Sequence, residues 1–519
     1  MFISIVFTVC LCLSVLVAAN CFCVINHGGE MNIGLKLTKE RLLRRKSVVA
    51  STALVFLTSS VLIGVGGNSS AQAAADCANK TLQLLSVGDP FEYALKEVLP
   101  QFTAETGIKV NLESLDNQTL SSRLATAFIT KKSDLDVVTV DNIWVGQYYD
   151  NGWILSLNDM IKENKDVDLK DMIPSVLYSI SEWRGQFVGL PMAPYAQGVM
   201  YRTDVYKSLG IATPSAGWTW DEYLANARKI HGKTVNGKKM NGTVIVGKQP
   251  VPIVHMYTQL MAGQGARWFK NFPEAPWDFT PTLASKENIR AATMYRDLYK
   301  VSPKEAISFD WFAAGMRFAD GDIGQMYWWT PYFYLVQNKG YMSGKPSPIV
   351  GKYAIADLPS EKGKPANIST GGWQLSIPST AECPKESFKL VKWVNSAKTQ
   401  KAMAKVSKYG TQFSDFGRYS NLRDPELIKM YPYLPKLEKM LEAGNGKVSR
   451  PGMQIYPALE GVYGLQLNKI LLGADVKKTL IETNSLFSNL LGGNMLLPYK
   501  GKSYNDTLQA TKDLIASLS

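Results

Sequence analysis

The stretch Phe318-Ala-Asp-Gly-Asp-Ile-Gly-Gln-Met-Tyr-Trp-Trp-Thr330 contains a turn signal followed by an apolar run. Its Asp-Gly-Asp triplet at 320–322 predicts a tight turn, because Gly tolerates a positive φ and Asp accepts hydrogen bonds from its own backbone. Residues 323–329 carry no charged side chain, which predicts a short strand buried on both faces, as in a parallel sheet. The strand ends in Trp328 and Trp329, whose side chains point to opposite faces, so at most one of them packs into the core.

Two interpretations of this tryptophan pair stay open. A Trp at the carboxyl end of a strand lies where open α/β sheets bind ligands, and a flat ring with one N–H donor suits the C–H face of a sugar or polyol. The alternative is that both rings are core residues, since Trp is largely buried in most proteins.

Length and composition indicate a large globular protein. The chain has 519 residues, of which 46% are hydrophobic and 19% are charged, enough for two to three domains or one large two-lobed unit. Without residues 1–73 it carries 51 Lys and Arg against 42 Asp and Glu. These charges form no long run of one sign, which indicates a solvated basic surface and no nucleic-acid partner.

The amino-terminal 73 residues have the pattern of a leader. An apolar run at 2–25 is followed by basic residues, by a second apolar run at 48–65, and by Ala71-Gln-Ala73. A basic region, an apolar stretch and an A-x-A site are typical of a secretory signal peptide, so we expect residues 31–73 to be one, cleaved after Ala73. Residues 1–30 are then either an upstream misreading of the start codon or an extra hydrophobic segment long enough to anchor in a membrane.

Export changes the interpretation of the cysteines. Four of the six lie in the leader, and Cys77 and Cys383 remain. In an oxidising compartment these two could form one disulfide; the alternative is two free thiols, because sequence does not show how close the two Cα atoms come.

After the leader, strand and helix patterns alternate. The order is a strand at 81–87, a helix at 91–106, a strand at 108–112, a helix at 120–128 and a strand at 134–140. This βαβαβ order predicts a parallel sheet with helices on both faces. The Gly- and Pro-rich stretch 180–201 interrupts the alternation and could cross between two lobes. Further helices are expected at 220–230, 286–299, 386–395, 396–405, 465–472 and 476–490.

Several short motifs follow one another along about residues 80–490, each weak alone and specific in their common order. They are Asp136-Val-Val-Thr-Val-Asp141, Gly189-Leu-Pro191, Met200-Tyr-Arg-Thr-Asp204, Trp218-Thr-Trp-Asp-Glu222, Phe318-Ala-Asp-Gly-Asp-Ile-Gly-Gln-Met326, Gly371-Gly-Trp-Gln-Leu-Ser-Ile377 and Ser387-Phe-Lys-Leu-Val-Lys-Trp393. In this order they resemble the extracellular solute-binding proteins of ABC importers, in the carbohydrate-binding family that includes the maltose-binding protein. Residues 262–269 look like the branch of that family that binds sugar alcohols. Gln325 departs from the pattern, which has Ala at this position.

The resemblance implies an α/β, two-lobed periplasmic binding protein fold of type II, with the ligand cleft between the lobes. We expect the first lobe at 78–193 plus 330–370 and the second at 197–326 plus 374–519. Crossings would fall near 191–201, 326–330 and 371–374. The implied function is capture of a sugar or sugar alcohol in the periplasm and delivery to the permease subunits of an ABC importer, by a monomer without a cofactor and without enzymatic activity.

Candidate ligand contacts are residues beside the expected crossings that offer a flat ring, a directional polar group or close backbone approach. Asp141 ends a buried strand, where the alternative is a helix cap; for each Trp the alternative is core packing, and for Tyr195 a role as a hinge aromatic. The candidates are Asp141, Asn142, Trp144, Tyr195, Trp268, Trp328, Trp329, Gly371, Gly372 and Trp373.

Two other functions remain open on the sequence. A secreted carbohydrate-active enzyme needs only a carboxyl pair, such as Asp141 and Asp310, although no sequence feature selects a pair. A binding protein of similar fold could take an iron complex, an amino acid or a phosphorylated compound. The sequence shows no G-x-S-x-G, H-E-x-x-H or P-loop motif.

Overall fold

The computed structural model describes residues 22–25, 31–34, 77, 79–89, 91–274, 276–336, 347–406, 413–492 and 507–519. The chain divides into two units, Met1–Ala73 and Ala74–Ser519. In the first unit, β1 (Phe22–Ile25) pairs antiparallel with β2 (Met31–Gly34); the expected signal-peptide features and cleavage site lie outside the described residues. Among the described residues, no helix combines the length and the apolar character needed to span a membrane.

The first lobe is built on a five-stranded sheet of order β4-β3-β5-β16-β8. β3 is parallel to β4 and to β5, while β16 runs antiparallel to both β5 and β8. The predicted parallel βαβαβ order is therefore confirmed for β3, β4 and β5. The elements of this part of the chain are β3 (Leu82–Val87), α2 (Phe91–Thr106), β4 (Val110–Leu115), α3 (Asn117–Thr130), β5 (Val137–Asp141), β8 (Leu190–Tyr195) and β16 (Gly371–Ser376).

The second lobe contains a three-stranded antiparallel sheet of order β14-β9-β15. Its strands are β9 (Gln197–Arg202), β14 (Gln325–Trp329) and β15 (Tyr353–Ala356). The strand expected at 323–329 is present and fully buried, but the expectation of a parallel sheet is wrong. Its burial comes from rings that pack on either side of it: Tyr327 meets Trp220 at the start of α8, and Trp328 covers Gly315 in α11.

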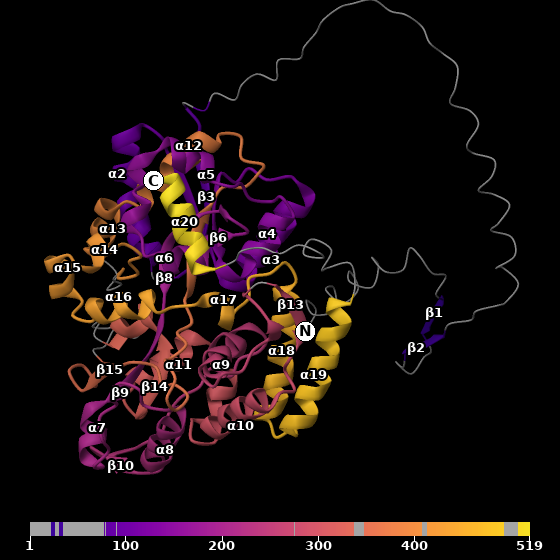
Figure 1. The fold of residues 1–519 in the computed structure, drawn as a ribbon, viewed down its shortest axis with the longest axis vertical. Coiled ribbons are helices and arrows are strands. Elements are labelled where there is room, and N and C mark those ends of the chain that lie inside the picture. The colour runs from indigo at the N-terminus through magenta and orange to yellow at the C-terminus, as the bar shows by residue number, and fades with distance from the viewer. Residues whose placement is uncertain are drawn as a thin grey trace, which may run out of the picture. The chain divides into compact units, whose positions relative to one another are not determined.

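The remaining helices and strands surround these two sheets (Figure 1). The helices are α4 (Val145–Asp150), α5 (Asn158–Glu163), α6 (Pro174–Val176), α7 (Thr203–Ser208), α8 (Trp220–Ile230), α9 (Val251–Gly263), α10 (Lys286–Lys300), α11 (Trp311–Ala319), α12 (Pro384–Val394), α13 (Ala397–Ala404), α14 (Tyr419–Leu422), α15 (Pro425–Met430), α16 (Leu434–Glu442), α17 (Gly446–Ser449), α18 (Tyr456–Leu471), α19 (Val476–Leu491) and α20 (Leu508–Leu518). The short strands are β6 (Glu182–Trp183), β7 (Gln186–Phe187), β10 (Thr234–Val235), β11 (Lys238–Lys239), β12 (Phe269–Asn271) and β13 (Asp278–Pro281).

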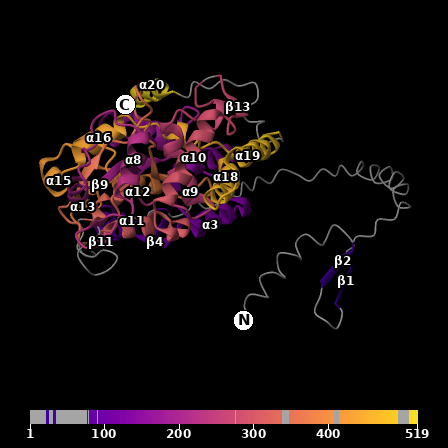
Figure 2. The same ribbon diagram turned by 90° about the horizontal axis from the view of Figure 1, so that it is seen from below.

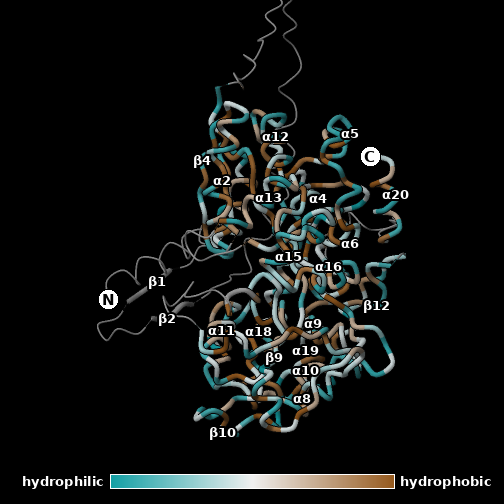
Figure 3. Tube along the Cα trace, turned by 90° about the vertical axis from the view of Figure 1, so that its left-hand side faces the viewer, coloured by the Kyte–Doolittle hydropathy of each residue, from teal (hydrophilic) through white to brown (hydrophobic). Residues whose placement is uncertain are grey.

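Helices α8, α9, α10, α18 and α19 pack into one group in the second lobe, and α9, α10, α18 and α19 lie close together in Figures 1 and 2. The predicted helix at 220–230 is confirmed to the residue by α8, whose capping box joins Thr219 and Glu222. α18 begins nine residues before the expected start at 465, because Pro457 is accommodated in its first turn, where Pro needs no hydrogen-bond donor. Figure 3 shows hydrophobic stretches inside each lobe and hydrophilic ones at its periphery, such as around β10.

A single residue separates strand β8 of the first sheet from strand β9 of the second. β8 ends at Tyr195 in the first sheet and β9 begins at Gln197 in the second. The crossing expected at 191–201 is therefore present, with Ala196 between the sheets. The end of β14 is tied to it, since the Thr330 N–H donates to the Ala196 carbonyl at 2.9 Å and the Ala196 N–H donates to Thr330 Oγ1 at 3.1 Å.

Strand pairing corrects the expected lobe boundaries. β15 lies within 330–370, which we expected in the first lobe, yet it pairs with β9 of the second. β16 overlaps 374–519, expected in the second lobe, yet it pairs with β5 and β8 of the first, and α12 and α13 pack on α2. Strands β14 and β15 both belong to the second sheet. The chain therefore passes to the first sheet between β15 and β16, and not at 326–330. Sequence does not reveal this, because pairing depends on which segments meet in space.

Cys77 and Cys383 are joined by a disulfide, with their Cα atoms 5.6 Å apart. Cys383 immediately precedes α12, so the bond ties the start of the second unit to the first lobe.

Candidate functional site

A cavity of about 210 Å³ lies between the two sheets. Its first-lobe walls come from the ends of β3, β5 and β8, the start of α3 and β16. Its second-lobe walls come from the starts of α9 and α11 and from the segment after β14. Polar and aromatic residues that line it are Asp89, Asp116, Asn117, Gln118, Asp141, Tyr195, Lys248, His255, Asp310, Trp311, Trp329, Tyr332, Trp373 and Arg450.

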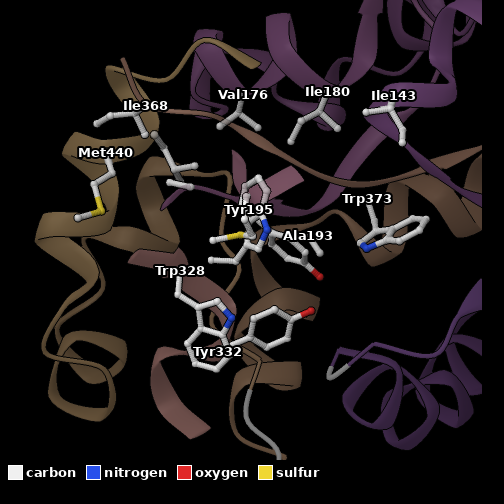
Figure 4. Close-up of a cluster of buried hydrophobic side chains, with 14 of the residues drawn as sticks. Ile143, Val176, Ile180, Ala193, Tyr195, Trp328, Tyr332, Ile368, Trp373 and Met440 are labelled. Carbon is white, nitrogen blue, oxygen red and sulfur yellow. The ribbon is translucent and has the colours of Figure 1, made fainter. Parts of the chain in front are cut away.

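Asp89 lines the cavity and is the centre of a hydrogen-bond network. Its carboxylate accepts from Tyr195 Oη at 2.8 Å, from Trp373 Nε1 at 3.0 Å and from Tyr332 Oη at 3.1 Å. Figure 4 shows the polar atoms of these three side chains turned toward one region. Burial raises the pKa of Asp89 to about 6, with a smaller contribution from the charge of Asp141, and the three donors oppose the rise. Since Tyr332 follows β14, the network joins the two lobes.

Asp141 lies at the carboxyl end of β5, as the sequence predicts. One oxygen accepts from the Ile143 N–H at 3.4 Å, and Arg450 Nη1 lies 3.8 Å from that oxygen. The side chain therefore caps the following turn weakly and also lines the cavity. Burial raises the pKa of Asp141, and the charge of Arg450 opposes the rise. A carboxylate can accept about four hydrogen bonds, so Asp141 retains acceptor capacity toward the cavity.

Arg450 follows α17 and is 2% exposed. Its guanidinium carbon lies 4.8 Å from the centre of the Trp329 ring, within the range of a cation–π contact. Its Nε and Nη2 have no hydrogen-bond partner among the described residues. A β-carbon at Gly371 would come within 1.4 Å of Nη2, so only glycine at 371 allows Arg450 to lie there.

The second lobe adds charged pairs to the rim. Lys248 Nζ lies 3.1 Å from Asp310 Oδ2, while the other oxygen of Asp310 caps α11. His255 also lines the cavity, and its Nε2 lies 3.0 Å from Oε1 of the buried Glu460. On the opposite side, Asp116 caps α3 through the N–H groups of residues 118 and 119. The cavity thus combines aromatic rings with carboxylates and cations, an arrangement that can hold a small ligand by apolar contact and by directed hydrogen bonds.

Comparison with known proteins identifies the family. The profile described as "Bacterial extracellular solute-binding protein" matches residues 87–401, which is more than half of the chain. The chain belongs to this family. A curated relative, a probable ABC transporter-binding protein of Deinococcus radiodurans, is 25% identical over 392 residues, covering 73% of this chain and 85% of the relative.

Solved structures agree with the two-lobed architecture. An ABC transporter solute-binding protein from Agrobacterium radiobacter K84, in complex with ribitol, is 30% identical with a TM-score of 0.69, covering 79% of this chain and 98% of that one. One from Agrobacterium vitis S4 with bound D-mannitol is 22% identical with a TM-score of 0.67 over 79% of this chain and 98% of that one. The solute-binding protein described here therefore has the two-lobed α/β fold implied by its motifs.

The structure brings five of the ten predicted site residues to the cavity. These are Asp141, Tyr195, Trp329, Gly372 and Trp373. Three others lie behind its wall: Trp144 makes an edge contact with the Trp373 ring at 5.7 Å between centres, Asn142 follows Asp141, and Gly371 accommodates Arg450.

Trp268 and Trp328, two of the candidate ligand contacts, are not among the residues that line the cavity. Trp268 donates to the Ser449 carbonyl at 2.8 Å and contacts the rings of Tyr456, Tyr463 and Phe487. Trp328 is fully buried, and its ring packs against Gly315 of α11. The rings of Trp328 and Tyr332 lie beside each other (Figure 4), with their centres 5.0 Å apart. Both are core residues, and the open question about the strand-end pair is decided: Trp329 faces the cavity and Trp328 faces the core.

Sequence reasoning missed Asp89, Tyr332, His255 and Arg450 in this solute-binding protein. The sequence could have indicated Asp89 as a site residue, because it comes shortly after a buried strand, much as Asp141 comes at the end of one. Arg450 had none, since it lies in a short loop far along the chain from Asp141 and Trp329.

Proposed function

We propose that this solute-binding protein captures a neutral sugar alcohol or small sugar in the cavity between its lobes and delivers it to the permease of an ABC importer. The observation that carries the proposal is that both lobes contribute aromatic and charged side chains to one cavity. A ligand held there contacts both lobes at once, so it favours the closed arrangement over an open one.

The size and charge of the cavity support this ligand class. Its volume of about 210 Å³ is below the roughly 300–1,000 Å³ of pockets for drug-sized ligands, which favours a monosaccharide or alditol over a long oligosaccharide. Among the described lining residues, four carboxylates face the two cations Lys248 and Arg450. This excess of negative charge disfavours anionic ligands. The ribitol-bound relative, 30% identical, points to the same class.

We further propose that Asp141, Tyr195, Trp329, Gly372 and Trp373 contact the ligand, together with Asp89 and Arg450. The protein acts as a monomer in the periplasm, exported by a signal peptide within residues 31–73, with its lobes divided according to the strand pairing described above.

A thermal-shift screen tests the proposal. The purified protein is heated with ribitol, D-mannitol, D-glucose, maltose and a trisaccharide, and binding to the folded state alone adds about 2.7 kcal/mol at a ligand concentration 100 times Kd. We expect the melting temperature to rise with an alditol or a monosaccharide, and calorimetry to give its Kd. No rise with any compound would refute the proposal. Chromatography of each compound after long incubation should show it unchanged; turnover would instead favour an enzyme that uses Asp141 and Asp310, both of which line the cavity.

A further inference from the structure

The carboxylate of Asp89 divides its two oxygens between the lobes. Its Oδ2 accepts from Tyr195 Oη at 2.8 Å and from Trp373 Nε1 at 3.0 Å, and both donors belong to strands of the first sheet. Its Oδ1 accepts from Tyr332 Oη at 3.1 Å, and Tyr332 follows β14 of the second sheet. The first lobe thus satisfies one oxygen with its own donors and presents the other to the second lobe.

Tyr332 is held in position for this contact by its own lobe. Its ring lies beside the ring of Trp328 (Figure 4) and near that of Phe312, with centres 5.0 Å apart in both pairs. Trp328 in turn packs on Gly315 of α11. Because these contacts limit the rotation of the Tyr332 side chain, its hydroxyl loses little freedom when it donates to Asp89.

Both partners of this hydrogen bond are removed from water. Asp89 is 7% exposed and Tyr332 is 4% exposed. A hydrogen bond to a charged group is stronger than one between neutral groups, and a buried carboxylate that loses a donor is destabilised. A hydrogen bond weakens steeply as its two oxygens move apart, so a small rotation of one lobe away from the other breaks it. The contact therefore favours the closed arrangement through groups of the protein alone.

We infer that the Tyr332–Asp89 hydrogen bond is a latch that populates the closed arrangement of the lobes before a ligand binds. The inference rests on the proposed function and deepens it, because a latch has consequences where closure of the lobes retains a ligand. A ligand that binds the closed arrangement gains apparent affinity in proportion to the fraction of the protein that is already closed. The latch thereby sets part of the affinity without contributing to the choice of ligand.

Distances between spin labels on the two lobes test the latch in protein without ligand. The labels are attached to cysteines introduced at Ile129 of α3 and at Leu472 after α18, which are 68% and 69% exposed and lie one in each lobe. The measurement is made at pH 8, where Asp89 is ionised because its pKa is about 6. We expect the wild type to show the distance of the present arrangement as one population. Tyr332→Phe should lower the ratio of closed to open protein roughly 10- to 150-fold, as for loss of one hydrogen bond to a charged group.

Two other Tyr→Phe substitutions are the controls. Tyr295 is buried and donates to the Val246 carbonyl at 2.6 Å within the second lobe, and it does not line the cavity. Tyr295→Phe should therefore leave both the ratio of closed to open protein and the Kd for ribitol unchanged. Tyr195→Phe removes a donor to the same carboxylate from within the first lobe, so it should leave the ratio of closed to open protein close to that of the wild type.

The label distances separate a latch from a direct contact with the ligand. Tyr332 also lines the cavity, so a weaker Kd in Tyr332→Phe would fit either role, whereas a residue that contacts only the ligand would not change the distances in ligand-free protein. An unchanged ratio in Tyr332→Phe, an equal fall in Tyr195→Phe, or a wild type without a closed population would overturn the inference and leave the proposed function standing. Failure of the wild type to bind any alditol or sugar would overturn the proposed function itself.

Discussion

The neighbouring tryptophans of β14 offer a direct test of how the strand divides core from cavity. Trp328 is fully buried, and its ring covers Gly315 of α11. Trp329, one residue later, lines the cavity beneath Arg450. Replacing each in turn by Ala should therefore separate folding stability from ligand binding.

Trp328→Ala removes a full indole from the core, and such substitutions cost about 3–5 kcal/mol of the free energy of unfolding. Because Trp328 does not line the cavity, the Kd for ribitol should stay within about twofold of the wild-type value. Trp329→Ala removes a ring that lines the cavity and contacts the Arg450 guanidinium. Loss of one such aromatic contact weakens the free energy of ligand binding by about 1–3 kcal/mol. That free energy corresponds to a rise in Kd of about 5- to 150-fold.

Urea unfolding monitored by circular dichroism gives the stability of each variant, and titration calorimetry with ribitol at 25 °C gives Kd for samples shown to be folded. If Trp328→Ala weakens binding as much as Trp329→Ala, or if Trp329→Ala leaves Kd unchanged, the assignment of the two faces is wrong. If the wild-type protein binds another alditol more tightly than ribitol, the Kd of each variant is measured with that alditol.

Two further predictions concern stability. The pKa of Asp89, about 6 against an ordinary 3.8, means that the native state binds a proton more tightly than the unfolded state. Its contribution to the free energy of unfolding should therefore rise by about 2 kcal/mol as the pH falls from 7 to 4. The rise is measured as a difference between wild type and Asp89→Asn in urea unfolding, and a pH-independent difference would contradict it. The Cys77–Cys383 disulfide joins two residues that are 306 positions apart in the sequence. Replacing both cysteines by Ser should therefore lower the free energy of unfolding by about 2–4 kcal/mol. Equal stability of the wild type and the double variant would argue that the bond is not formed.

The hydrogen bonds of Asp89 bear on the proposed closure of the lobes, because they join the first lobe to the second. Asp89 follows β3 in the first lobe, and Tyr332 follows β14 in the second. Arg450, from the segment after α17, lies beside Asp141 on the same cavity. Asp89 therefore has hydrogen-bond partners from both lobes, and in the proposed closed arrangement its network lies where a ligand would bind.

Local patterns determined much of the fold. The alternation of apolar segments located β3, α2 and β5, and the apolar spacing of residues 220–230 located α8. Such features depend on residues close together in sequence, so the sequence contains them. The ordered motifs also implied the family and the two-lobed architecture.

Tertiary structure alone decided which segments meet. Strand β16 joins the first sheet although β15, shortly before it, joins the second, and nothing in either segment specifies its partner. Strand alternation showed that Trp328 and Trp329 face opposite ways, but the position of α11 decided which ring is buried. Arg450 reaches Asp141 and Trp329 only because the chain after α17 returns to the cavity, and Gly371 leaves it space. Sequence thus determined the elements and the kind of site, whereas the pairing of distant segments decided the residues that form it, because long-range contacts are set by packing of the whole chain and not by local periodicity.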